Sequence, residues 1–155
     1  MSRIRKEIIE SLESNDFNYS TIRGAQANAL IDKIKLEYIH GEQNYPFWDN
    51  LAKWVGVDYA FSWEWLPDLI RGTTIYLFTD QDDLKEEVFI IDNGDCLPEI
   101  MEACSGFTFY ITDSECNYLV CYNDHDNLIA SGTAIDWLLN FEIVKNNKLT
   151  IYSNT

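Results

Sequence analysis

The first quarter of the chain is patterned for helices. Ile4, Ile8 and Leu12 recur every four residues with charged residues between them, which is the spacing of an amphipathic helix. Asn15-Asp16 interrupts this pattern. A second helix is expected after Tyr19-Ser20-Thr21, which offers an N-cap, and it is expected to end near His40-Gly41. Its predicted inward side consists of Ile22, Ala25, Ala29, Leu30 and Ile34.

After Gly72 the pattern changes to short runs of β-branched and aromatic residues separated by polar turns. Such runs are typical of strands joined by hairpins. The clearest strands are expected over residues 73–78, 87–92, 107–112 and 118–122, and two brief ones over 128–130, at a sheet edge, and 149–152. Short helices are predicted over residues 97–103 and over 134–139, the latter with Thr133 as its N-cap.

This order of elements predicts the fold class α+β. We expect N-terminal helices packed on an antiparallel sheet of about four to six strands, covered on one face, with a late C-terminal helix. No repeat, low-complexity linker or internal boundary interrupts the pattern. Residues 1–155 are therefore expected to form a single domain, which is long enough for one hydrophobic core.

Residues 45–71 are irregular and strongly aromatic. Short helical turns are expected near residues 51–55 and 65–70. Packing in the core is the simplest interpretation of the aromatic side chains, and a partner-binding surface is the alternative, because exposed Trp and Tyr dominate binding free energies. The aromatic residues of this segment are Tyr45, Phe47, Trp48, Trp54, Tyr59, Phe61, Trp63 and Trp65.

Charge adds a constraint that the hydropathy pattern does not contain. The net charge is −15, and residues 71–140 contribute −12 of it, with fourteen acidic side chains against Arg71 and Lys85. Residues 1–40 are neutral overall. A surface of this kind repels phosphate and anionic lipid and attracts basic proteins. We therefore expect no direct binding to nucleic acid or membrane, and a basic protein as the partner.

Most of these acidic residues fall on predicted turns between strands. If the turns meet at one end of the sheet, they form a pole of carboxylates, but this depends on a strand order that the sequence leaves open. The alternative is a solvated face that only keeps the protein soluble. The predicted partner-binding residues are Asp80, Asp82, Asp83, Glu86, Asp113, Glu115, Asp124 and Asp126, together with Trp63, Trp65 and Tyr122.

The turn that contains Asp124, His125 and Asp126 combines residue types used in metal binding and acid–base catalysis. Adjacent residues in an extended segment point to opposite sides, and the only other histidine, His40, has no supporting motif. A polar turn stabilised by Asx side chains is therefore favoured. No nucleophile elbow or phosphate-binding glycine motif occurs. We predict no metal site, no cofactor and no enzyme activity, with a small enzyme or metal-dependent regulator as the alternative.

The four cysteines contain no Cys-x-x-Cys pair and are expected to be buried and reduced. The first residues lack an apolar signal region, and no window approaches the ~18 apolar residues of a spanning helix. These features predict a cytoplasmic protein.

The last third of the chain resembles a group of small bacterial domains. The resemblance rests on Phe109-Tyr110-Ile111-Thr112-Asp113, on residues 118–126 and on Gly132-x-Ala134-Ile135-x-Trp137-Leu138. In these domains an aromatic strand, a hairpin, a polar His-Asp turn and a Gly…Trp-Leu helix follow one another. Similar domains are grouped with the immunity proteins that neutralise polymorphic or contact-dependent toxins. The chain departs from the pattern at Asp124, where a second histidine is expected.

The resemblance implies an acidic immunity-type inhibitor with no catalytic residues. Such a protein binds a cognate basic bacterial toxin, most simply a nuclease, and occludes its active site. Two alternatives stay open. One is a nucleic-acid mimic encoded by a phage or mobile element, and the other is a small structural or regulatory module whose charge only gives solubility.

Overall fold

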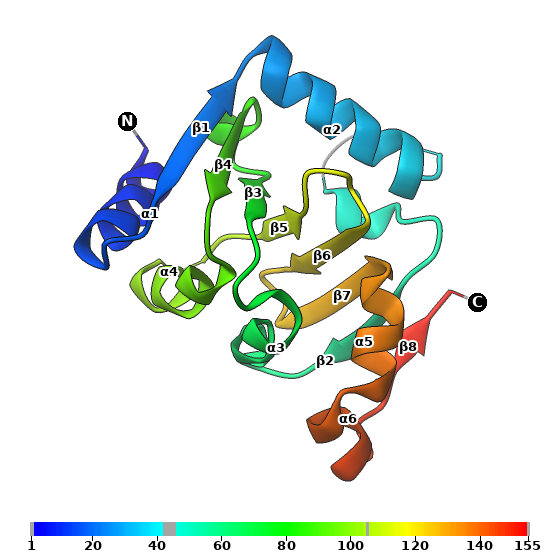
Figure 1. Ribbon diagram of the computed structural model, residues 1–155. Coiled ribbons are helices and arrows are strands. Elements are labelled where there is room, and N and C mark those ends of the chain that lie inside the picture. The colour runs from blue at the N-terminus through cyan, green and yellow to red at the C-terminus, as the bar shows by residue number, and fades with distance from the viewer. Residues whose placement is uncertain (1, 42–45, 105, 155) are drawn as a thin grey trace.

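The structure is a computed structural model that describes residues 2–41, 46–104 and 106–154, without the side chain of Asp82 (Figure 1). Its α-helices are α1 (Arg3–Ser14), α2 (Ala25–Tyr38), α3 (Pro67–Ile70), α4 (Leu97–Ala103), α5 (Ala134–Asn140) and α6 (Glu142–Asn146). Its strands are β1 (Tyr19–Arg23), β2 (Val55–Asp58), β3 (Ile75–Thr79), β4 (Glu87–Ile91), β5 (Phe109–Thr112), β6 (Tyr118–Tyr122), β7 (Asn127–Gly132) and β8 (Tyr152–Ser153). Short 3-10 helices are η1 (Phe47–Asp49), η2 (Ser62–Trp65), η3 (Asp82–Leu84) and η4 (Gly94–Cys96).

The strands form one antiparallel sheet in the order β1-β4-β3-β5-β6-β7-β2-β8. The α+β class is confirmed, but the eight strands exceed the four to six expected. The prediction of a short helix near residues 51–55 is wrong. Leu51 forms an isolated bridge with Ile39, and Val55 begins strand β2, which pairs with β7 in register Gly56↔Ile129. The edge strand predicted over residues 128–130 is the longer strand β7, which lies inside the sheet between β6 and β2. The strand predicted over 149–152 is reduced to the two residues of β8.

The prediction for the second helix placed its start too early. Tyr19–Arg23 is strand β1, which pairs with β4, and Ile22 lies opposite Val88. The β-branched side chains of Thr21 and Ile22 favour a strand when a partner edge is available. Gly24 then turns the chain into α2 with a left-handed φ of 58°, which glycine adopts without steric cost. The shifted start changes the buried side of the helix to Ala27, Ile31, Ile34 and Tyr38.

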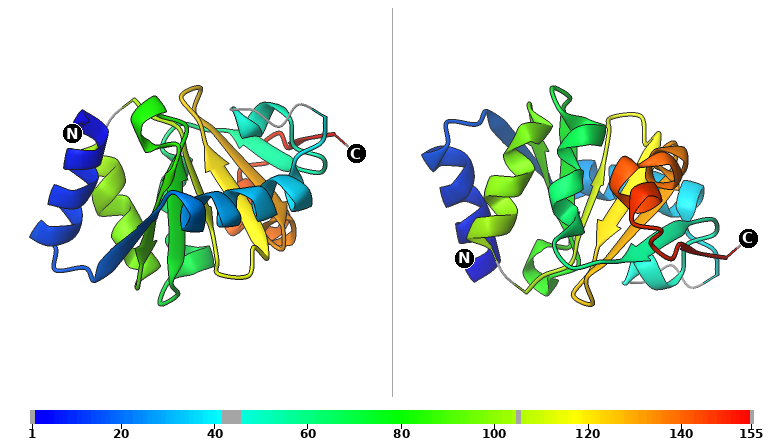
Figure 2. Two further views of the ribbon diagram at one scale, coloured as in Figure 1. Left: turned by 90° about the horizontal axis from the view of Figure 1, so that it is seen from above. Right: turned by 90° about the horizontal axis from the view of Figure 1, so that it is seen from below.

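Both faces of the sheet are covered, which corrects the expectation of one covered face. Helices α1, α4, α3 and α5 pack on one face, where Ile8, Leu12 and Ile100 join the larger core cluster. Helix α2 and η1 pack on the other, where Ile34 and Phe47 join the second cluster. Figure 2 shows α2 in front of the sheet in one view and α4, α3 and α5 in front of it in the other. The N-terminal helices therefore lie on opposite faces.

The predictions for the remaining helices agree better with the structure. Helix α1 buries Ile4, Ile8 and Leu12 as its spacing predicts, and Ser2 caps it by accepting a hydrogen bond from the Arg5 N–H. Helix α4 has the predicted bounds. Helix α5 begins after Thr133, although the hydroxyl of this residue makes no capping bond.

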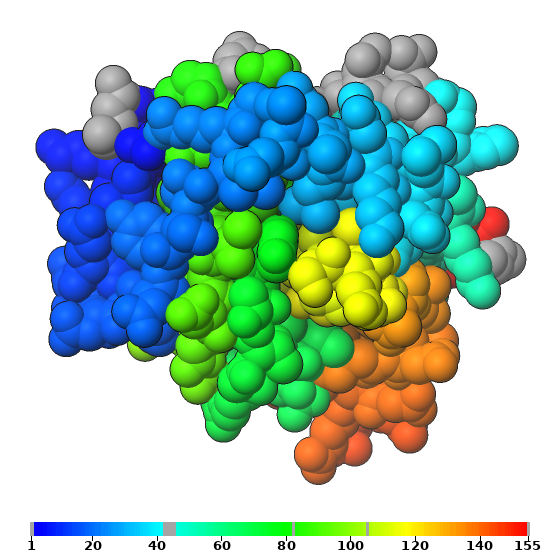
Figure 3. Space-filling model, turned by 45° about the horizontal axis from the view of Figure 1, so that its top comes forward, coloured from blue at the N-terminus to red at the C-terminus, as the bar shows by residue number. Residues whose placement is uncertain are grey.

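Helix α2 is the longest helix described, with 14 residues, and no described helix combines the length and apolarity needed to cross a bilayer. It lies across the sheet in Figure 3, next to the yellow β5–β6 turn. The Tyr38 hydroxyl at its C-terminal end donates a hydrogen bond to the Cys116 carbonyl in that turn. All four cysteines are free and buried.

Candidate functional site

The strand order divides the acidic turns between two ends of the sheet. Because neighbouring strands are antiparallel, β3 and β6 run in the same direction, and the turns that follow them lie at the same end. We call this the hollow end, formed by residues 80–86 and 123–126. The β5–β6 turn, residues 113–117, lies at the opposite end, as Figure 2 shows. The predicted set of carboxylates therefore does not form one pole.

At the hollow end the two turns line one cavity of about 420 Å³, which we call the inter-turn hollow. Asp80 enters it from the β3–β4 turn, and Asp124 and His125 enter it from the β6–β7 turn. Lys85 adds one positive charge to the lining. Asp83 and Glu86 are exposed on the same turn as Asp80, and their carboxylates have no hydrogen-bond or ion-pair partner among the described residues.

The β6–β7 turn is built by side-chain hydrogen bonds. The amide oxygen of the buried Asn123 accepts from the backbone N–H groups of His125 and Asn127, at 3.0 and 3.1 Å. Asp126 has a left-handed φ of 61° and accepts a hydrogen bond of 2.8 Å from the Tyr122 hydroxyl. Burial, and then the hydrogen bond to Asp126, raises the pKa of Tyr122 to about 12. This arrangement is the Asx-stabilised turn that the sequence favoured.

The geometry gives little support to a metal site at this turn. His125 Nε2 lies 3.6 Å from the Asp124 carboxylate, and both side chains are more than half exposed. The His125 ring is held by an edge contact with Trp48, with 5.9 Å between the ring centroids. Within the described ranges, no group of three or more His, Cys, Asp or Glu residues is placed to hold a metal ion.

Two acidic residues of the opposite end, Asp113 and Asp95, are used in local structure. Asp113 accepts hydrogen bonds from the backbone N–H groups of Glu115 and Asn117 and from the Asn117 amide. Asp95 lies 3.4 Å from the Arg71 guanidinium. Of the predicted partner-binding acids, Asp113 and Glu115 are therefore separated from Asp80, Asp83, Glu86, Asp124 and Asp126, while Asp82 belongs to the hollow end by its place in η3.

The three predicted aromatic anchors are packed inside the protein. Trp63 and Trp65 are each 7% exposed, and Tyr122 is 6% exposed. Core packing accounts for them, and they offer a partner little surface. The exposed aromatic residues of the hollow end are instead Tyr59, at 43%, and Phe61, at 63%. Tyr45 lies outside the described residues.

Phe61 is held in an unusual conformation at the hollow end. It has a left-handed φ of 62°, which is rare for a bulky side chain. Its backbone N–H donates a hydrogen bond of 3.2 Å to the Tyr122 hydroxyl, which in turn donates to Asp126. The neighbouring Tyr59 N–H donates to the Asp126 carbonyl. These bonds attach the segment that carries both exposed rings to the acidic β6–β7 turn.

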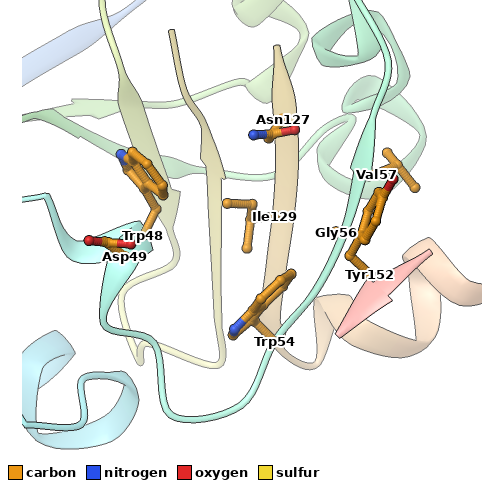
Figure 4. A pocket seen from close by; sticks show the side chains of 8 residues that line it. All are labelled: Trp48, Asp49, Trp54, Gly56, Val57, Asn127, Ile129 and Tyr152. Atoms are coloured by element: carbon orange, nitrogen blue, oxygen red, sulfur yellow. The ribbon is translucent and has the colours of Figure 1, made fainter. Parts of the chain in front are cut away.

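A second cavity, of about 210 Å³, lies on the α2 side of the sheet over β7, β2 and β8 (Figure 4). We call it the aromatic slot. Trp48 lines both this slot and the inter-turn hollow, so the two cavities are adjacent. The slot is lined by Trp48, Asp49, Trp54, Gly56, Val57, Asn127, Ile129 and Tyr152.

The sequence pattern did not predict this slot, although part of its signal was present. Trp48 and Trp54 belong to the aromatic segment already noted, but Tyr152 is contributed by β8 from the far end of the chain. Gly56 in a strand is a signal of close approach by another group. Only the pairing Gly56↔Tyr152 shows which residues meet there.

Comparisons of the chain with protein-family models, with curated proteins and with solved structures found no match.

Proposed function

We propose that this protein is an acidic immunity-type inhibitor that binds a cognate basic bacterial toxin, most simply a nuclease, and neutralises it by occluding its active site. The observation that carries the proposal is the convergence of two acidic turns on the inter-turn hollow. Asp80 and Asp124 are far apart in the chain, yet they line the same cavity. A cleft that binds phosphate groups is attracted to carboxylates presented in this way.

The exposed aromatic residues beside these turns support a protein partner. Tyr59 and Phe61 are fixed to the acidic turn through Asp126 and Tyr122. Rigid aromatic side chains at the centre of an interface commonly supply most of its binding free energy. In the proposed complex the carboxylates raise the association rate, and Tyr59 and Phe61 slow dissociation. The inhibitor needs no cofactor, and its place of action is the cytoplasm of the cell that makes the toxin.

The test is neutralisation of the toxin by this protein. The product of the gene immediately upstream is expressed alone and together with this protein, and cell growth is measured. We expect toxicity when the upstream product is expressed alone, and restored growth and a one-to-one complex when this protein is present. An upstream product that is harmless, or that stays equally toxic in the presence of this protein, contradicts the proposal.

The two alternatives predict different results in related assays. A nucleic-acid mimic inhibits a host nuclease and has no toxin partner encoded beside it. A module whose charge only gives solubility binds no basic protein at the hollow end. Its affinity for any other partner is unchanged when the charges of Asp83 and Asp124 are reversed.

A further inference from the structure

We propose that the aromatic slot binds an arginine side chain of the basic partner. This inference rests on the proposed function, because it names the group that anchors the partner next to the acidic turns. The slot is lined by aromatic rings, a carboxylate and an amide. It lies next to the inter-turn hollow, because Trp48 lines both cavities.

The lining of the slot fits a guanidinium group. The rings of Trp48, Trp54 and Tyr152 surround the cavity. In Figure 4 the Asn127 amide lies at its upper side and the Asp49 carboxylate at its left side. Cations bind to the faces of Trp and Tyr rings, and the planar guanidinium also stacks on them. A carboxylate pairs with the same group through parallel hydrogen bonds. Asp49 makes no side-chain hydrogen bond or ion pair with any described residue, so it is available for this contact.

The size of the slot favours a single side chain over a free small molecule. Its volume of about 210 Å³ is below the ~300–1,000 Å³ of typical ligand pockets. It is many times the ~10–15 Å³ that one water molecule needs when volume is measured in this way. A side chain delivered by a partner protein fits this range, and the net charge of −15 favours a cationic one.

The position of Trp54 in the slot depends on its neighbours. Gly56 also lines the slot, and a Cβ atom there would lie 3.3 Å from the Trp54 ring and 3.2 Å from the Leu128 carbonyl. A glycine therefore lets Trp54 lie close to the strand. Asn154 holds Trp54 and β8 together, because its Oδ1 accepts from the Trp54 N–H and its Nδ2 donates to the Ala52 carbonyl. The backbone of the segment that carries Trp54 is thereby joined to the residue that follows β8, the strand that carries Tyr152.

The test compares two peptides of equal length and charge, one alternating glycine with arginine and one alternating glycine with lysine. Their affinities are measured by fluorescence anisotropy at ~0.1 M salt, where charges beyond about 10 Å are screened. We expect the arginine peptide to bind the unmodified protein at least about fivefold more tightly than the lysine peptide. Trp54→Leu is expected to remove this preference while leaving the affinity for the lysine peptide within about twofold.

Two further variants separate the slot from general effects of folding and charge. Tyr152→Leu changes a side chain that is 53% exposed, and it replaces Trp54→Leu if that variant fails to fold. Asp49→Asn is expected to weaken the arginine peptide more than Asp92→Asn, which removes the same charge at the opposite end.

Equal binding of the two peptides to the unmodified protein, unchanged by Trp54→Leu, would overturn the inference. Binding of a matched glycine–norleucine peptide as strong as that of the arginine peptide would also overturn it, because the slot would then take an apolar side chain. If both basic peptides bind in a salt-dependent way without using the slot, the inference fails and the proposed function stands. If the protein does not neutralise the toxin but still prefers the arginine peptide, the proposed function fails and the inference about the slot stands.

Discussion

Both ends of the sheet carry exposed acidic residues, but their carboxylates make different contacts. At the hollow end, Asp83 and Glu86 have no partner among the described residues, and Asp80 and Asp124 line a cavity. At the opposite end, Asp113 accepts three hydrogen bonds that build its own turn. The comparison shows that the number of acidic residues in a region does not define a binding surface. The difference lies in whether a given carboxylate, such as that of Glu86 or that of Asp113, is already used within the fold.

Two glycines with left-handed φ distinguish the ends most strongly. At the opposite end, a Cβ on Gly132 would lie 2.5 Å from the Asn117 carbonyl. A Cβ on Gly106, beside the hollow, would have no atom within 4 Å among the described residues other than its chain neighbours. We expect Gly132→Ala to lower the free energy of unfolding by about 3 kcal/mol, through overpacking and backbone strain. Gly106→Ala has only the strain and is expected to cost about 1 kcal/mol. Urea unfolding of both variants measures the difference, and equal losses would contradict the packing at Gly132.

Two neighbouring acidic residues, Glu86 and Glu87, are expected to differ in their contribution to the free energy of unfolding. Glu87 is buried at the start of β4, 2.9 Å from Arg5 and 3.1 Å from Arg23, whereas Glu86 is exposed. Glu87→Gln leaves two arginines without their carboxylate, and we expect it to lower the free energy of unfolding by about 3 kcal/mol. Glu86→Gln is expected to change it by less than about 0.5 kcal/mol. Thermal unfolding of the pair is the check, and a large effect at Glu86 would show that it has a structural role.

Strand β6 contains one tyrosine near each end of the sheet, and removing the hydroxyl oxygen from each compares the two ends. Tyr122, at the hollow end, uses its hydroxyl to bind Phe61 and Asp126, whereas the buried Tyr118 hydroxyl has no hydrogen-bond partner within the described part of the chain. Tyr122→Phe is expected to lower the free energy of unfolding by about 1–2 kcal/mol. Tyr118→Phe is expected to leave it unchanged or raise it slightly, because no hydrogen bond is lost. The reverse order in denaturant unfolding would contradict the hydrogen bonding described for the hollow end.

The smallest effect at neutral pH comes from the raised tyrosine pKa values. Burial is the main cause that raises the pKa of Tyr38 and of Tyr122 to about 12. A raised pKa in the folded state contributes stability that is complete below the ordinary tyrosine pKa of about 10 and is lost as the pH rises through about 12. Unfolding measured against pH is expected to show this alkaline loss. Tyr122→Phe should make it shallower, and an unchanged slope would contradict the shift.

The sequence predicted those parts of the fold in which pattern and neighbours agree. Ile4, Ile8 and Leu12 repeat every four residues and form the buried side of α1. Residues 19–23 could not be predicted in the same way, because Thr21 and Ile22 suit either element. Only the free edge of β4 decides that they form a strand.

The candidate site was predicted in composition but not in arrangement. The acidic turns follow from the residues, whereas the division between the two ends follows from a strand order that needs long-range pairing. Residue type alone predicts that Trp63 and Trp65 anchor a partner, yet their burial in the fold decides whether the rings can reach one. Tyr59 and Phe61 of the same segment are the exposed ones.

We propose that the hollow end, rather than total charge, recognises the basic partner. The most direct measurement is the association rate with the proposed toxin partner for Asp83→Lys/Asp124→Lys, compared with Asp92→Lys/Glu115→Lys at the opposite end. Both double variants change the net charge by the same amount, because each reverses two carboxylates. At low salt we expect the first to slow association about tenfold and the second less than about twofold. Equal slowing by the two variants would contradict the claim and leave only the charge of the whole protein.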